Sequence, residues 1–212
     1  MTPVFKKGSR SSASNYRPVS LTCIACKVME KLIREQLMRH LVNNELITKN
    51  QYGFVPGRSC LTQLLETLDD WTSINDDGGS VDVVYMDYMK TFDTVPYGRL
   101  LIKLSAYGFK GKILGWIRDF LRSRKQRVVV NSVKSEEARV SSGIPQGSVL
   151  GPLLFVIFIN DLPENVRKEI KMFADDTKLY ARSDKDERPQ KLQEDLNAMQ
   201  TWSDKWLLRF YP

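Results

Sequence analysis

Acidic residues in apolar surroundings are the clearest sign of chemistry in this 212-residue chain. Asp87 follows the apolar run 81–86, and the pair Asp175-Asp176 stands between two further apolar runs. An Asp pair in a tight turn is most often solvated, and Asp87 by itself could cap the next element. The apolar flanks favour a different interpretation, in which buried strands carry all three acids into one cleft.

Three carboxylates that meet at one point repel each other unless divalent cations neutralise them. Hard oxygen ligands select Mg²⁺ or Mn²⁺, and two such ions about 3.5–4 Å apart hold the reacting groups of an in-line phosphoryl transfer. One ion would lower the pKa of an attacking hydroxyl, and the other would stabilise a leaving pyrophosphate. The acids therefore predict two-metal nucleotidyl transfer.

Hydrophobic periodicity and turn residues predict the elements that would position these groups. Helical spacing occurs over 21–42, 60–74, 97–107, 110–122, 148–161 and 186–206. Strand signals predict a buried strand at 81–86, a strand pair at 126–131 and 138–142, and a hairpin of 170–173 with 177–181. The loop 142–148, SGIPQGS, precedes an apolar helix, and residues 1–20 should form an irregular arm, since they contain Pro3 and Pro18. Helices and strands interleave, so the predicted class is α+β.

Composition excludes several classes of protein. Hydrophobic residues make up 42% of the chain and charged residues 27%, which is typical of globular proteins and not of disordered ones. The longest apolar run, 149–159, contains Gly151 and Pro152 and is too short to span a bilayer, and no secretory signal opens the chain. With three cysteines and one histidine we expect neither a disulfide framework nor a zinc site, and we expect an intracellular protein.

Charge is distributed unevenly along the chain, whose formal net charge is +7. The net charge is +6 over residues 1–50, −6 over 51–98 and +8 over 99–139. This alternation predicts a positive wall for a polyanion and a negative pocket for metal ions. Solvated helix faces would produce the same pattern, and charge alone does not separate the two interpretations.

The order Asp87, then Gly143-Ile144-Pro145-Gln146-Gly147, then Phe173-Ala174-Asp175-Asp176 resembles the palm motifs A, B and C of a reverse transcriptase. Further segments are similar to the polymerases of LINE-type (non-LTR) retrotransposons of the jockey and chicken-repeat kind. They are FKKG (5–8), NYRPVSL (15–21), QYGF (51–54), GRS (57–59), KTFDTVP (90–96), GSVLGPLLF (147–155) and INDL (159–162). The resemblance covers essentially the whole chain.

The resemblance implies a catalytic and metal-binding role for the three acids. Asp87 and Asp175 would bind two Mg²⁺ (or Mn²⁺) ions with Asp176 beside them, and the backbone carbonyl of Tyr88 would complete one coordination shell. Phe92 would lie under the incoming sugar and exclude a ribose 2′-hydroxyl, although without the motif it would be an ordinary core residue.

Other positions would contact nucleotide or nucleic acid. Gln146 and Gly147 would lie against the pair of template and nucleotide bases. Arg17 and Arg58 would face the triphosphate or the template strand, as guanidinium groups suit phosphate oxygens. A basic segment could line the nucleic-acid channel through contacts that weaken with salt; its members are Arg118, Arg122, Arg124, Lys125 and Arg127.

The implied fold is the right-hand polymerase, with a small antiparallel palm sheet packed on helices. Residues 1–80 would be mainly fingers, and residues 81–212 mainly palm with some finger strands. The implied partners are an RNA template, a DNA primer and dNTPs, with no membrane. The implied location is the nucleus and cytoplasm, as a ribonucleoprotein. The thumb and endonuclease of such elements have no counterpart here, so we expect an excerpt of a longer protein or a truncated copy.

Three departures from the family pattern stand out. Family members commonly carry Ala where Thr91 stands and often Arg or His near Val55, and we expect neither change to touch a metal ligand. The lysine expected shortly after Trp206 is absent.

Other functions stay open at this point. The chain could be an inactive remnant that only binds nucleic acid, or a pseudogene product without a selected function. A template-independent transferase or an RNA-templated RNA polymerase would use the same two-metal logic, although Phe92 favours deoxynucleotides.

Overall fold

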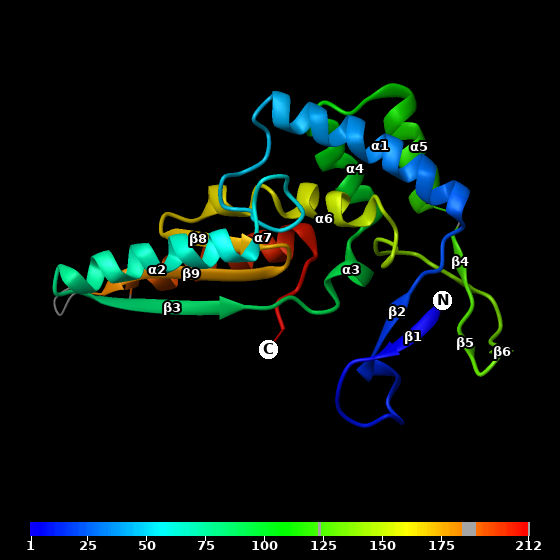
Figure 1. Ribbon diagram of the computed structural model, residues 1–212, viewed down its shortest axis with the longest axis horizontal. Helices are drawn as coiled ribbons and strands as arrows, with labels where there is room; N and C mark the ends of the chain where they lie inside the picture. The colour runs from blue at the N-terminus through cyan, green and yellow to red at the C-terminus, as the bar shows by residue number, and fades with distance from the viewer. Residues whose placement is uncertain (123, 184–189, 212) are drawn as a thin grey trace. The chain divides into compact units, whose positions relative to one another are not determined.

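The computed structural model describes residues 1–122, 124–183 and 190–211, and the chain divides into two compact units (Figure 1). Unit 1 comprises Met1–Asn43 and Phe92–Leu154, and unit 2 comprises Asn44–Thr91 and Phe155–Pro212. Helices and strands are mixed in both, which confirms the α+β class. Residues 44–80 belong to the same unit as the main sheet, and the division into fingers and palm stays a prediction.

Unit 2 is built on a three-stranded antiparallel sheet in the order β3-β9-β8. The strands are β3 (Ser80–Met86), β8 (Glu169–Phe173) and β9 (Asp176–Ser183), which confirms the predicted strand and hairpin. Alternate residues of β8 are buried, Ile170 and Met172 among them, because successive side chains of a strand point to opposite faces.

Helices also pack together in the described part of unit 2. Helix α2 (Cys60–Asp76) begins at a capping box between Ser59 and Thr62 and lies along the sheet, in contact with β3 and β8 (Figure 1). Helix α6 (Gly151–Ile159) continues from unit 1 into unit 2 and is completely apolar after its first residues. It packs through Phe158 against Trp202 and Trp206 of α7 (Gln190–Trp206), and the short 3₁₀ helix η2 (Leu162–Asn165) lies beside α7.

The described residues of unit 1 form four α-helices besides the start of α6. They are α1 (Ile24–Asn43), α3 (Thr91–Thr94, whose first residue lies in unit 2), α4 (Tyr97–Ala106) and α5 (Gly111–Leu121). Leu37, Leu41, Leu100 and Ile117 are buried in its core, and α4 packs against α5. The predicted helices of this region are confirmed.

The predicted strand pair of 126–131 with 138–142 is only partly correct. Strand β4 (Lys125–Gln126) pairs with β7 (Ala138–Arg139), and a second hairpin, β5 (Val129–Val130) with β6 (Val133–Lys134), replaces the expected polar turn. Its two loop residues, Asn131 and Ser132, both have positive φ (49° and 65°), which is the type I′ geometry of tight hairpins.

The prediction of an irregular arm at residues 1–20 is wrong. Strand β1 (Thr2–Phe5) pairs with β2 (Tyr16–Val19), and the 3₁₀ helix η1 (Ala13–Asn15) lies between them. Pro3 and Pro18 face each other in this ladder. Lys6 N donates to Asn15 O, so by alternation the proline pair occupies a position without hydrogen bonds, where a missing N–H costs nothing.

None of the helices within the described residues combines the length and the apolar character needed to cross a bilayer.

Candidate active site

The three predicted acids lie at the same end of the unit 2 sheet. Asp87 is the first residue after β3, Asp175 lies in the two-residue turn between β8 and β9, and Asp176 begins β9. Met86 pairs with Thr177, so Asp87 and Asp176 occupy the next position along two neighbouring antiparallel strands. The sheet register therefore brings together residues that are almost ninety positions apart in the sequence.

Asp87 and Asp175 lie close enough to Asp176 for their charges to affect its protonation. Burial raises the pKa of Asp176, and the negative charges of Asp175 and Asp87 raise it further. A cation bound between these oxygens would remove the repulsion. The donor set of hard carboxylate oxygens fits Mg²⁺ or Mn²⁺.

Two of the acids are held by hydrogen bonds. Asp87 Oδ1 accepts from the Tyr88 N–H at 2.8 Å, and Asp175 Oδ2 accepts from Thr91 Oγ1 at 2.8 Å. The expectation that Thr91 touches no metal-ligand candidate is therefore wrong. The sequence shows a threonine hydroxyl four residues after Asp87, but it does not show which residue this hydroxyl contacts. Its partner, Asp175, lies 84 positions away, and hydrophobic periodicity does not predict contacts at that separation.

A cleft of about 370 Å³ opens at this end of the sheet. It is lined by Gln63, Tyr85, Met86, Asp87, Asp176, Thr177 and Lys178. Lys178 is buried, and burial lowers the pKa of its ammonium group. Across the described parts of the chain, no three His, Cys, Asp or Glu side chains are arranged closely enough to form a ready metal cluster.

The last described residues of the chain hydrogen-bond to the backbone of the segment that begins at Asp87. Residues Arg209–Tyr211 run antiparallel to residues 87–89: Tyr211 N donates to Asp87 O, and Met89 N donates to Arg209 O, both at 2.9 Å. The ring of Tyr88 is buried and stacks on Phe210 with centroids 4.6 Å apart. Burial strongly raises the pKa of the Tyr88 phenol. The role of its carbonyl as a metal ligand stays a prediction; that oxygen accepts from Thr91 Oγ1 at 3.3 Å.

The residues predicted to contact the nucleotide and template bases, Phe92, Gln146 and Gly147, all belong to unit 1. Gln146 Nε2 donates to Asp93 Oδ1 at 2.9 Å, and Phe92 O accepts from Ile144 N at 2.6 Å. Gly147 has φ +92°, and a Cβ there would lie 2.9 Å from Ser20 O. The glycine is thus required by a close backbone approach within unit 1, and the roles of these residues toward a substrate stay predictions.

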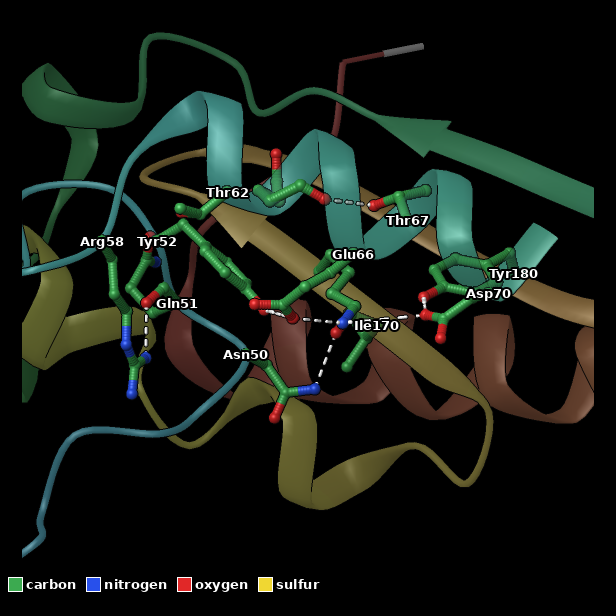
Figure 2. Close-up of polar contacts among 12 residues, drawn as sticks. Asn50, Gln51, Tyr52, Arg58, Thr62, Glu66, Thr67, Asp70, Ile170 and Tyr180 are labelled. Atoms are coloured by element: carbon green, nitrogen blue, oxygen red, sulfur yellow. Dashed lines mark hydrogen bonds and ion pairs between the residues drawn. The ribbon is translucent and has the colours of Figure 1, made fainter. Parts of the chain in front are cut away.

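The two arginines predicted to face a triphosphate or template have different surroundings. Arg17 is exposed on β2. Arg58 Nη1 donates to the carbonyls of Thr48 and Gln51, both at 2.7 Å, so this side chain braces the loop that precedes α2 (Figure 2). Neither position shows whether the arginine contacts a phosphate group, so both roles stay predictions.

Most of the basic segment is engaged within unit 1. Arg124 is the clearest case, because its Nη2 donates to Tyr97 Oη and Gly143 O at 3.1 Å and so braces the loop 142–148. Lys125 and Arg127 both pair with Glu137, at 2.6 and 3.0 Å. Arg118 pairs with its neighbour Asp119 at 3.6 Å, and Arg122 is exposed at the end of α5. Their role in a channel stays a prediction.

A second hollow of about 430 Å³ is lined by residues of α2, of β8 and of the segment 49–58 that precedes α2. It carries charges of both signs from Lys49, Arg58, Lys171, Glu66 and Glu169. Lys171 Nζ contacts Glu66 at 3.0 Å and Asp70 at 3.8 Å, while Tyr52 donates to Glu66 and Tyr180 to Asp70. Burial acts to lower the pKa of Lys171, but the acidic neighbours outweigh it and raise that pKa. This network ties α2 to the sheet.

Comparison with known proteins shows the family of the chain. The profile of the reverse transcriptase (RNA-dependent DNA polymerase) family matches residues 4–212, and the chain belongs to that family. The chain is 30% identical over 210 residues to the probable RNA-directed DNA polymerase from transposon BS of Drosophila melanogaster, covering 95% of this chain and 23% of that protein. It is also 30% identical over 208 residues to the polymerase from mobile element jockey of the same organism, covering 94% and 23%.

The chain therefore spans about a quarter of the length of these relatives. The expected resemblance to non-LTR retrotransposon polymerases is confirmed. Among solved structures, telomerase from Candida albicans, in complex with a fragment of telomeric RNA, superposes with a TM-score of 0.61 at 11% identity. The match covers 88% of this chain and 34% of that one, and it confirms the right-hand polymerase fold.

Proposed function

We propose that this chain catalyses RNA-directed DNA synthesis, in which a primer 3′-hydroxyl attacks the α-phosphate of a dNTP opposite an RNA template. The observation that carries the proposal is the meeting of Asp87, Asp175 and Asp176 at one end of the sheet, where Asp176 experiences the charge of both other acids. Family membership supports the same reaction.

Reverse transcriptases use divalent metal ions, and this site would hold two Mg²⁺ or Mn²⁺ ions. Asp87, Asp175 and Asp176 would supply carboxylate oxygens, and Tyr88 its backbone carbonyl. Bound there, the ions would activate the 3′-hydroxyl and offset the charge of the leaving pyrophosphate.

The chain's own residues orient these groups. Thr91 holds the Asp175 carboxylate through its hydroxyl, and the Tyr88 N–H holds Asp87. Phe92 would select the deoxyribose, and Gln146 with Gly147 would support the templating base pair. RNA template, DNA primer and dNTPs are the proposed partners, and the proposed setting is an intracellular ribonucleoprotein.

Primer extension tests the proposal directly. The chain is incubated with a DNA primer on an RNA template, dNTPs, and Mg²⁺ or Mn²⁺, with EDTA as the metal-free control. We expect extension that follows the template sequence and stops with EDTA. Extension without template would indicate a terminal transferase, and preference for NTPs an RNA polymerase. Binding of primer–template without extension in any metal would contradict the proposal and favour a nucleic-acid-binding remnant.

A further inference from the structure

The side chain of Gln51 binds both backbone polar groups of Ala174, the residue directly before Asp175. Gln51 Oε1 accepts from Ala174 N at 2.8 Å and from Gly53 N at 2.8 Å, and Gln51 Nε2 donates to Ala174 O at 3.3 Å. Gln51 is completely buried and Ala174 nearly so. A single amide therefore satisfies groups that would otherwise lie unpaired in the interior.

The turn that carries the acids needs such support. Phe173 pairs with Asp176, so Ala174 and Asp175 alone reverse the chain, and Ala174 has φ +55°. The left-handed region is unfavourable for a residue with a Cβ, and glycine is the usual choice there. Surrounding contacts must therefore hold Ala174 in this conformation.

Gln51 is itself fixed to the sheet edge. Tyr52 N donates to Met172 O and Met172 N to Asn50 O, both at 2.8 Å, so this short segment runs parallel to β8. Arg58 also donates to Gln51 O (Figure 2). From the same segment, the backbone of Gly53 approaches so closely that a Cβ would lie 2.4 Å from Ala174 N.

We propose that Gln51 is a positioning residue that holds Ala174 in its left-handed conformation and thereby sets the direction in which Asp175 and Asp176 present their carboxylates. The catalytic meaning of this role rests on the proposed function. Gln51 touches none of the reacting groups, and it acts only through the turn.

The test compares Gln51→Met with Asn160→Leu in the full chain. Asn160 is the matched control because it is a buried amide of the same unit that also makes two backbone contacts, with Thr48 N at 2.9 Å and Leu46 O at 2.7 Å. Both substitutions keep the approximate size of the side chain and remove its hydrogen bonds. Two quantities are measured: hydrogen exchange of the Ala174 amide without metal, relative to Leu179 in the core of β9, and the Kd for Mn²⁺ by calorimetry.

We expect Gln51→Met to speed exchange at Ala174 relative to Leu179 by about tenfold, as loss of one buried hydrogen bond implies. The Kd for Mn²⁺ should rise by a similar factor, whereas Asn160→Leu should leave both within about twofold. If Gln51→Met does not fold, Gln51→Asn offers the same comparison, because it keeps a polar amide in the interior but withdraws it by one methylene from Ala174 N.

Unchanged relative exchange at Ala174 in the Gln51 variant would overturn the proposal, and so would equal changes in both variants. A wild-type chain that binds no Mn²⁺ would refute the proposed metal site. The exchange data would then still decide whether Gln51 holds the turn, so the two failures are distinguishable.

Discussion

Glu30 should be one of the most important single side chains for the stability of unit 1. It is fully buried in α1, and its Oε2 accepts from Val149 N at 2.7 Å and Leu150 N at 3.0 Å, directly before α6. These N–H groups form the positive amino-terminal end of α6, where a carboxylate is favourable. Glu30 thereby joins α1 to the start of α6 within the same unit.

The cost of removing this carboxylate can be worked from its contacts. A hydrogen bond to a charged group contributes about 1.5–3 kcal/mol, and Glu30→Ala removes the two from Val149 N and Leu150 N together with a weaker third from Cys26 Sγ at 3.3 Å. We expect a loss of about 3–5 kcal/mol in the free energy of unfolding. Glu30→Gln keeps an oxygen with two lone pairs, which can accept both bonds at neutral strength, so its loss should be about 1–2 kcal/mol.

Urea unfolding followed by circular dichroism measures these differences. Glu35→Gln is the control, because Glu35 is exposed on the same helix and its substitution should change stability by less than about 0.5 kcal/mol. A loss below about 1 kcal/mol for Glu30→Ala would refute the reasoning. If Glu30→Ala and Glu30→Gln lost equal free energy of unfolding, the contact would be stabilised by the negative charge and not by the geometry of the two hydrogen bonds.

Three further outcomes follow from the site and its loop. Because the pKa of Asp176 is raised in the folded state, ionisation of its carboxyl lowers the free energy of unfolding. Asp176→Asn should therefore be about 0.5 kcal/mol more stable than wild type at pH 7 without metal. Below about pH 4, where the carboxyl is protonated in wild type, the variant should have no advantage. Urea titrations at both pH values decide this, and an advantage that persists at low pH would contradict it. Gly147→Ala should destabilise the chain by about 2 kcal/mol, because Gly147 has a positive φ and lies close to the Ser20 carbonyl. Gly98→Ala is the control and should not destabilise the chain, because there is open space around Gly98. Equal melting temperatures for the two variants would contradict this prediction. Phe92→Ala should raise the use of NTPs relative to dNTPs in primer extension, and unchanged sugar selection would assign Phe92 to the core.

Helices and strands of this chain could be predicted because each produces a local pattern of apolar and turn residues in the sequence. The strand before Asp87 follows from a short β-branched and aromatic run, the hairpin around Asp175 follows from two short apolar runs and a turn, and both are present. The prediction of an irregular arm at residues 1–20 fails because two prolines are harmless when they face each other at a position without hydrogen bonds.

The contacts that support the site left no such signal. Gln51 meets Ala174 across 123 positions, and Glu30 meets Val149 across 119. Each is a side chain bound to the backbone of a distant segment, so its partner is decided by the tertiary fold and not by neighbouring residues. The three acids could be proposed as a metal site from their types and flanks, but the residues that hold them could be identified only in the structure.

The central claim is that Asp87, Asp175 and Asp176 form the metal-dependent site of a polymerase. The most direct measurement is primer extension on an RNA template by wild type, Asp175→Asn and the control Asp69→Asn, an exposed acid on α2, with folding checked by circular dichroism. We predict that Asp175→Asn folds and loses extension by at least about 100-fold, while Asp69→Asn matches wild type. Metal-dependent extension by Asp175→Asn at the wild-type rate would contradict the account.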